Sequence, residues 1–192
     1  MKDIFRFAAI LMLVALIASG ALAYINKITQ PRILEQQAKV LNDGLKAVLP
    51  GTESGVIEPV EVDEQVLYYK GYSDAGKTQL VGYALLAVGR GYSSDIRTIF
   101  GVDTTFAILS TKVLSQNETP GLGTLCEQIK YGDSTPWWQD QFRGKDLIQL
   151  SVDKDGGDIQ SLTGATITSR AITNSIAQSL TWLQEQVAEQ AE

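Results

Sequence analysis

Three threonines lie within a short segment of small residues that leads into a helix. The segment Ser161–Ser169 reads SLTGATITS, and its threonines are Thr163, Thr166 and Thr168. Gly164 and Ala165 carry almost no side chain, so a bulky planar ligand could lie close against the backbone there. A helix N-terminus offers unpaired N–H groups and a partial positive charge, which favour a phosphate. The segment therefore predicts a site where a threonine hydroxyl meets a phosphate-bearing ligand.

The helix that would position this segment is visible in the spacing of apolar residues. Thr168 or Ser169 reads as its N-cap, and the helix is expected from about Ser169 to Glu189. Its apolar residues recur at spacings of 4, 4, 3 and 4, at Ile172, Ile176, Leu180, Leu183 and Val187. Such spacing places them on one face, which would pack against a core. The same residues also fit an ordinary capped helix after a tight turn, so this segment alone does not establish a ligand site.

Two further motifs lie upstream. The segment Glu118–Gly123 reads ETPGLG, 40 to 50 residues before the threonines. A β-turn would account for Pro120 and the glycines, but not for Glu118, Thr119 and Leu122. The third segment, Gly89–Ile96, reads GRGYSSDI and is followed by GVD at residues 101–103.

Together these segments resemble a known family. The TGAT string resembles the S/T-G-A-T motif of the FMN-binding domain shared by the G subunit of Rnf electron-transport complexes and the C subunit of sodium-pumping NADH:quinone reductases. Glu118–Gly123 resembles that family's E-T-P-G-L-G signature, and Gly89–Ile96 its G-x-G-Y-x-x-x-I segment. With a hydrophobic N-terminus and 192 residues, the resemblance covers nearly the whole chain, and the length favours the Rnf G type over the quinone-reductase type.

The resemblance implies a cofactor, its attachment and partners. The matching acceptor residue is Thr166, which in the family is esterified to the phosphate of FMN in a phosphothreonyl linkage. The residues expected around the flavin are Thr163, Gly164, Ala165, Thr168, Glu118, Thr119, Gly121, Leu122 and Gly123. A flavin transferase would attach the FMN, and the other subunits of a membrane oxidoreductase would exchange its electrons. The Rnf type couples ferredoxin and NAD oxidoreduction to sodium or proton movement.

Two positions depart from the family pattern. Gln160 stands where the flavin-transferase signature usually has an aspartate, and Asp158 lies two residues earlier. Asn117 precedes Glu118 where many relatives carry a histidine. The alternative function is therefore a membrane-tethered assembly or binding module without attached flavin.

The N-terminus predicts a membrane anchor. Residues 7–25 carry no charge over 19 positions, about 28 Å as a helix, which is enough to span a bilayer. A cleaved signal peptide is the competing interpretation, because Lys2 and Arg6 precede the apolar run and residues 21–23 read ALA. Positive charges on both sides of the run leave the orientation open. The resemblance places the globular part outside the cytoplasm, at a bacterial inner membrane.

Composition excludes several functions. Residues 26–192 carry 14 Lys and Arg against 21 Asp and Glu, a balance that repels nucleic acid. The chain has no histidine and one cysteine, Cys126, expected to be a buried apolar residue. This excludes a His-based catalytic triad, an intrachain disulfide and a cysteine-based metal site. Redox work would therefore need an organic cofactor.

The remaining elements predict an α+β fold, with an anchor at residues 1–30 and one FMN-binding domain at 31–192. Pro31 punctuates the chain, and a helix is expected over Ile33–Val48. Residues 51–65 look acidic and turn-rich. The strands of a mainly antiparallel sheet flanked by helices are expected at Val66–Tyr72, Leu80–Val88, Ile96–Val102, Thr105–Leu114 and Leu147–Val152, with a short helix at Pro136–Phe142. Trp137 and Trp138 are expected to pack in the core rather than stack on a ligand.

Overall fold

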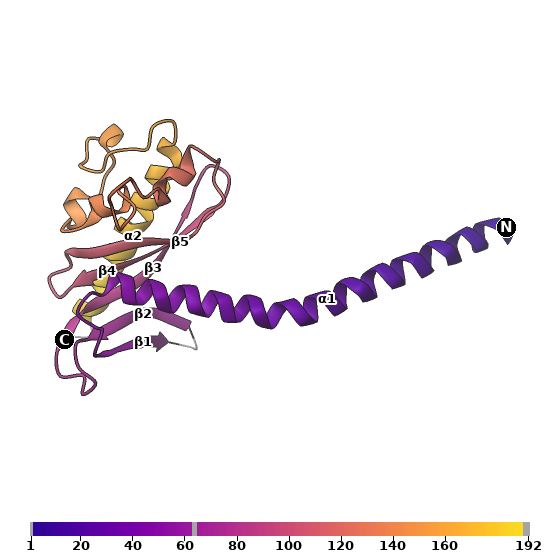
Figure 1. Cartoon of the computed structure of the whole chain (residues 1–192), viewed down its shortest axis with the longest axis horizontal. Helices are drawn as coiled ribbons and strands as arrows, with labels where there is room; N and C mark the ends of the chain where they lie inside the picture. Colours follow the sequence, from indigo (N-terminus) through magenta and orange to yellow (C-terminus); the bar gives the residue numbers. More distant parts are fainter. Residues whose placement is uncertain (1, 63–64, 190–192) are drawn as a thin grey trace. The chain divides into compact units, whose positions relative to one another are not determined.

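The computed structural model describes residues 2–62 and 65–189. The chain divides into two compact units between Leu41 and Asn42. The described part of the first unit lies within one helix, α1 (Lys2–Val48). The second unit contains the end of α1, a sheet, a long C-terminal helix and the segments between them (Figure 1).

Helix α1 runs for 47 residues, with Pro31 inside it. The expected interruption at Pro31 is therefore wrong. A proline removes one backbone hydrogen bond and crowds the preceding turn, but the uninterrupted bonds on both sides keep a long helix continuous. Of the described residues, α1 alone is long and apolar enough to cross a membrane, with a mean hydropathy of 2.4 over its most apolar window.

Five antiparallel strands form the sheet in sequence order. They are β1 (Val56–Val62), β2 (Gln65–Tyr72), β3 (Leu80–Arg90), β4 (Asp95–Asp103) and β5 (Ile108–Ser115). The mainly antiparallel sheet is thus confirmed. Strand β1 lies in the segment that was expected to be acidic and turn-rich. The sequence did not indicate it, because it is a partly exposed edge strand that contains a proline and two glutamates.

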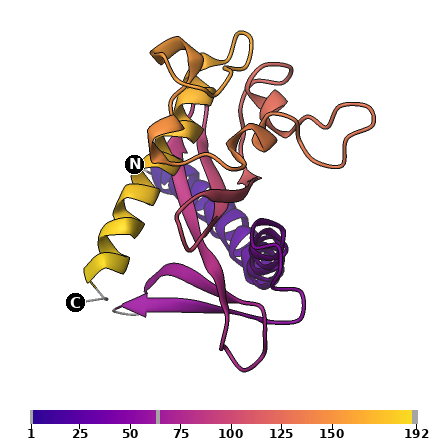
Figure 2. The same cartoon turned by 90° about the vertical axis from the view of Figure 1, so that its left-hand side faces the viewer.

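A helix lies against each face of the sheet within the second unit. Helix α2 (Thr166–Glu189) crosses the face that carries Leu85 and Phe100 (Figure 2), and its apolar residues are fully buried there: Ile172, Ile176, Leu180 and Leu183. The other face receives the last turn of α1, where Leu45 and Val48 are buried and Gly44 lies against Ile99. The predicted apolar face of α2 is confirmed, and the fold is α+β.

Three local expectations are wrong. Leu147–Val152 is not a strand, because the Asp146 side chain accepts hydrogen bonds from the N–H groups of Ile148 and Gln149 and caps a 3₁₀ turn, η3 (Leu147–Gln149). The expected helix at Pro136–Phe142 is a turn followed by a 3₁₀ segment, η2 (Gln139–Phe142). Strand β5 begins at Ile108 rather than Thr105, because Asp103 holds residues 105–107 in a tight turn.

We predict that residues 7–25 remain attached in the mature protein. N-terminal sequencing of protein purified from membranes should find a chain that starts at or near Met1, because the apolar stretch continues as one helix into the buried turn at Leu45 and Val48. A mature terminus at Tyr24 would show instead that residues 21–23 are a cleavage site.

Candidate functional site

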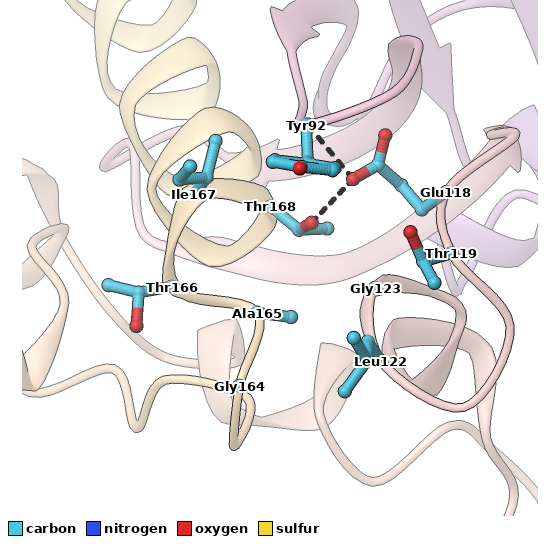
Figure 3. Close-up of a pocket in the computed structure, with 10 residues that line it drawn as sticks. All are labelled: Tyr92, Glu118, Thr119, Leu122, Gly123, Gly164, Ala165, Thr166, Ile167 and Thr168. Atoms are coloured by element: carbon cyan, nitrogen blue, oxygen red, sulfur yellow. Dashed lines mark hydrogen bonds between the residues drawn. The ribbon is translucent and has the colours of Figure 1, made fainter.

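One cavity of about 600 Å³ brings the sequence motifs together (Figure 3). It lies between the start of α2, the segment after β5 and the loop joining β3 to β4. Its lining residues are Tyr92, Glu118, Thr119, Leu122, Gly123, Gly164, Ala165, Thr166, Ile167 and Thr168. The cavity therefore contains all the predicted site residues except Thr163 and Gly121.

The Glu118 side chain joins these three segments. Its carboxylate accepts hydrogen bonds from the backbone N–H groups of Tyr92, Ser93 and Ser94, each at 3.0 Å. The Ser94 hydroxyl donates a further bond at 3.0 Å, and the Thr168 hydroxyl donates one at 2.6 Å. Glu118 is only 4% exposed. Each of its oxygens is thus bonded to protein, and the carboxylate fixes the hairpin loop against the first turn of α2.

These contacts keep Glu118 ionised. Burial of the carboxyl raises its pKa, but the hydrogen bonds act in the opposite direction, and the bond from Thr168 is the strongest of them. The backbone bonds from Ser93 and Tyr92 and the Ser94 hydroxyl add to it. The net result lowers the pKa of Glu118 from 4.5 to about 2.

Gly123 allows this close arrangement. A Cβ atom built at Gly123 would lie 2.6 Å from Glu118 Cβ and 2.8 Å from Thr168 Oγ1. Any larger residue would therefore separate Glu118 from Thr168, whose hydroxyl donates the shortest hydrogen bond to the carboxylate. The second glycine of the ETPGLG segment is therefore required by packing at the cavity wall.

Helix α2 begins at Thr166, three residues before one of the expected caps, Ser169. The Ser169 hydroxyl instead accepts a bond from the Leu162 N–H and donates one to the Ala165 carbonyl. Gly164 has φ +74°, a conformation that favours glycine, and forms the turn before the helix. The expected N-cap at Thr168 or Ser169 is wrong because both hydroxyls make tertiary or back-bonded contacts inside the helix.

The three threonines of the segment have different surroundings. Thr163 is exposed in the turn, and Thr168 is buried and bonded to Glu118. Thr166 is partly buried at the edge of the cavity, and its hydroxyl points away from Glu118 (Figure 3). Among the described residues, nothing hydrogen-bonds to the Thr166 hydroxyl or to its backbone N–H. Of the two threonines of this segment that line the cavity, Thr166 is thus the one whose hydroxyl is not engaged by the described residues.

The cavity also contains two residues that the site prediction missed. Tyr92 is 70% exposed and follows Gly91 in the third motif, so that motif carried a signal for it. Ile167 is half-exposed between Thr166 and Thr168, and its apolar side chain alone gave no such signal. Gly121 lies outside the lining, in a turn where its N–H donates to the Thr124 hydroxyl.

The three aspartates before the threonine segment all have partners. Asp153 accepts hydrogen bonds from the N–H and hydroxyl groups of Ser161, the first residue of that segment. Asp158 accepts bonds from Lys145 and Gln149, and Asp155 forms a two-pronged ion pair with Arg170. The lysine bond lowers the pKa of Asp158 and the arginine bond that of Asp155. Both carboxylates are therefore already paired with cations.

The two neighbouring tryptophans, Trp137 and Trp138, pack outside the cavity. Trp138 is fully buried, meets Phe142 edge-to-face at 5.3 Å and donates a hydrogen bond to the Gln160 carbonyl. The Trp137 ring lies under the Lys130 ammonium, 3.8 Å from its centroid. Neither tryptophan lines the cavity, which supports the predicted packing role. Cys126 is buried, and burial raises the pKa of its thiol to about 12.

The geometry suits the binding of a ligand. No group of three or more His, Cys, Asp or Glu residues that could hold a metal is present among residues 2–62 and 65–189. The cavity offers an apolar wall, a few hydroxyls and the N–H groups at the start of α2. Those features fit a planar, phosphate-bearing ligand of moderate size.

Comparisons with known proteins match both parts of the chain. A family described as FMN-binding domain matches residues 91–181, and one described as RnfG N-terminal region matches residues 1–48. The G subunit of an ion-translocating oxidoreductase complex of Methanosarcina acetivorans is 30% identical, over 96% of this chain and 97% of its own.

Two further relatives have similar coverage. The G subunit of an ion-translocating oxidoreductase complex of Shewanella amazonensis is 31% identical over 98% of this chain and 92% of its own. The G subunit of the Na(+)-translocating ferredoxin:NAD(+) oxidoreductase complex of Acetobacterium woodii is 28% identical over 93% of this chain and 91% of its own.

We predict that Glu118 makes unfolding strongly acid-dependent. Because its pKa is lower in the folded state, the ionised carboxylate stabilises the fold above pH 4.5 and loses this effect as pH falls through about 2. At about 1.4 kcal/mol per pKa unit, it contributes on the order of 3 kcal/mol at neutral pH. Denaturant unfolding of the full-length protein in detergent should show Glu118→Gln much less stable than wild type at pH 7.

The difference between Glu118→Gln and wild type should shrink steadily between pH 4.5 and pH 2. Asp95→Asn is the matched control, because Asp95 is exposed and pairs only with the exposed Arg90. It should change stability by less than about 1 kcal/mol at pH 7. Parallel curves for wild type and Glu118→Gln over this pH range would contradict the assignment.

Proposed function

The chain belongs to the family of G subunits of ion-translocating oxidoreductase complexes, and on this premise we propose that it carries FMN esterified to Thr166. The protein is a membrane electron-transfer subunit with an FMN-binding domain, and the other subunits of the complex are its partners. The covalent bond is the proposal. The observation that carries it is the position of Thr166, the first residue of α2 at the edge of the cavity, with its hydroxyl unengaged.

The residues present fit an FMN. The cavity volume of about 600 Å³ lies within the range of small-ligand sites, and Leu122, Ala165 and Ile167 give it an apolar wall for a planar ring. The N–H groups of Thr166, Ile167 and Thr168 precede the first internal bonds of α2 and can face a phosphate. Gly164 and Ala165 keep the approach to Thr166 free of larger side chains.

The surroundings of Thr166 support the need for a flavin transferase. Ester formation removes the proton of the Thr166 hydroxyl and, taken overall, releases one water from FMN and threonine. Among the described residues, no carboxylate hydrogen-bonds to this hydroxyl to take the proton. A separate enzyme would therefore supply the base and an activated flavin nucleotide. The Thr166 oxygen would bond to the FMN phosphorus while the P–O bond to the other part of the donor breaks, and that part would leave with the electron pair. The partly exposed Thr166 could reach such an active site.

When bound, FMN supplies reversible electron transfer, and the protein supplies its position and electrostatic environment. The names of the relatives describe ion translocation, and that of the Acetobacterium woodii protein specifies Na⁺ and ferredoxin:NAD⁺ oxidoreduction. We extend to this chain a part in coupling such electron transfer to Na⁺ or H⁺ movement. We also propose that residues 1–30 anchor it and that residues 31–192 form the FMN-binding domain on the extracytoplasmic side of the inner membrane.

The second candidate function is a tethered assembly module without flavin. Gln160 in place of the usual aspartate favours it, since Asp155 and Asp158 are paired with Arg170 and Lys145. The two functions differ in one simple observation. Protein that stays yellow and fluorescent after denaturation and acid precipitation carries covalent flavin, whereas a colourless precipitate would favour the assembly module.

We predict that Thr166 alone accepts the flavin. Intact mass of the full-length protein co-expressed with a flavin transferase should rise by one FMN less one water, and Thr166→Ala should abolish the rise. Thr163→Ala is the matched control, because Thr163 is exposed outside the cavity, and it should keep the full mass increase. A mass shift that survived in Thr166→Ala would contradict the assignment.

We predict that Thr119 and Leu122 contact the flavin rather than only shape a turn. Thr119→Val or Leu122→Ala should change the flavin spectrum or its reduction potential, because both side chains line the cavity. A shift of about 30 mV corresponds to roughly 1.4 kcal/mol for a two-electron couple. Ile148→Ala, at a side chain that is 91% exposed and outside the cavity, is the control. If both lining variants stayed folded with unchanged flavin yield, spectrum and potential, the segment would be only a turn.

A further inference from the structure

Among the residues that the structure describes, Glu118 is the only acidic or basic side chain that lines the cavity. The other lining residues are apolar, small, hydroxyl-bearing or, at Tyr92, phenolic. The ion pairs among the described residues do not include Glu118. Its carboxylate therefore brings a net negative charge to the cavity wall with no cation beside it.

Every partner of this carboxylate is a neutral dipole. Three consecutive backbone N–H groups, at Tyr92, Ser93 and Ser94, point at its two oxygens, and two hydroxyls complete the set. Such a concave run of N–H groups stabilises an anion in place. Dipoles hold the carboxylate ionised, but they do not cancel its net charge as a lysine or arginine would. The low pKa of Glu118 agrees with this arrangement.

A buried charge beside a cavity acts on whatever the cavity holds. Water screens a charge that is only 4% exposed much less than it screens surface charges. Reduction adds electrons to a flavin ring, and a fixed negative charge close by opposes that addition. The charge would therefore stabilise the oxidised flavin relative to the reduced flavin.

We propose that Glu118 is a fixed, uncompensated negative charge that lowers the reduction potential of the flavin held in this cavity. The inference rests on the proposed function, because it requires FMN at this site. It assigns Glu118 a role distinct from joining the three loops. Joining them needs hydrogen-bond acceptors, whereas lowering the potential needs net charge.

The test is a redox titration of full-length, FMN-loaded protein in detergent. Glu118→Gln removes the charge and keeps the side-chain length, and it should favour the reduced flavin at least tenfold at a given potential, about 30 mV for a two-electron couple. Asp95→Asn is the matched control, since it removes one charge from the same hairpin at a residue that is exposed and paired with Arg90. It should change the ratio less than twofold. A change below threefold in Glu118→Gln, or one in the opposite direction, would overturn the proposal.

A second variant separates charge from structure. Ser94→Ala keeps the Glu118 charge and removes a hydroxyl that donates to Glu118 and accepts from the Asn117 N–H, so it loosens the contact between the loops; Ser94 does not line the cavity. It should lower the flavin potential or leave it unchanged. The Glu118 charge stays the same, and the Ser94 hydroxyl dipole that partly offsets it is removed. If Glu118 acted only by joining the loops, Ser94→Ala would disturb them in the same sense as Glu118→Gln and raise the potential. A rise in Ser94→Ala would therefore overturn the proposal, including where Glu118→Gln fails to fold or to load.

Two controls keep this outcome separate from the proposed function. Intact mass of the wild type decides whether FMN is covalently attached, and it does not depend on the behaviour of Glu118→Gln. Repeating the titration in 1 M NaCl tests burial of the charge. The Glu118→Gln difference should persist there, since salt screens exposed charges far more than buried ones. Its loss in high salt would contradict a buried, unscreened carboxylate.

Discussion

The hydrogen bonding of one buried carboxylate determines the form of the candidate site. Glu118 receives donors from the hairpin loop between β3 and β4 and from the Thr168 hydroxyl in α2, which lies 50 residues away in sequence. Burial of an unbonded carboxylate would cost several kcal/mol, so the three segments are held in an arrangement that satisfies it. The sheet, covered by α2 on one face and by the last turn of α1 on the other, gives these loops a stiff base. The cavity is the space that remains between them.

The same arrangement separates the roles of chemically similar side chains. Thr166 and Thr168 are two residues apart on a helix and therefore point in different directions. Thr168 turns toward Glu118 and is used by the fold, whereas Thr166 turns toward the cavity edge and keeps its hydroxyl available. A bond that orders the site thus also leaves one threonine free for modification, which is what a covalently bound cofactor would need.

The sequence by itself determined the features that depend on local patterns. The spacing of Ile172, Ile176, Leu180 and Leu183 determined the buried face of α2, and runs rich in β-branched and aromatic residues located β2, β3 and β4. Small residues and motif resemblance singled out Thr166 and the Glu118–Gly123 segment. The resemblance to the FMN-binding family was also available from those residues alone.

Only the tertiary structure decided how the motif residues are used. Glu118 was expected near the flavin, and only the structure shows that its oxygens accept hydrogen bonds from donors in two other segments. Thr168 and Ser169 looked like caps by type, yet α2 begins before them. The Thr168 hydroxyl bonds to Glu118, and the Ser169 hydroxyl bonds to Leu162 and Ala165. Leu147–Val152 has the composition of a strand, but the Asp146 side chain caps a 3₁₀ turn at its start, so no strand forms there. In each case, side-chain hydrogen bonds override local propensity, and for Glu118 and Thr168 the partners lie far away in sequence, where no local pattern can identify them.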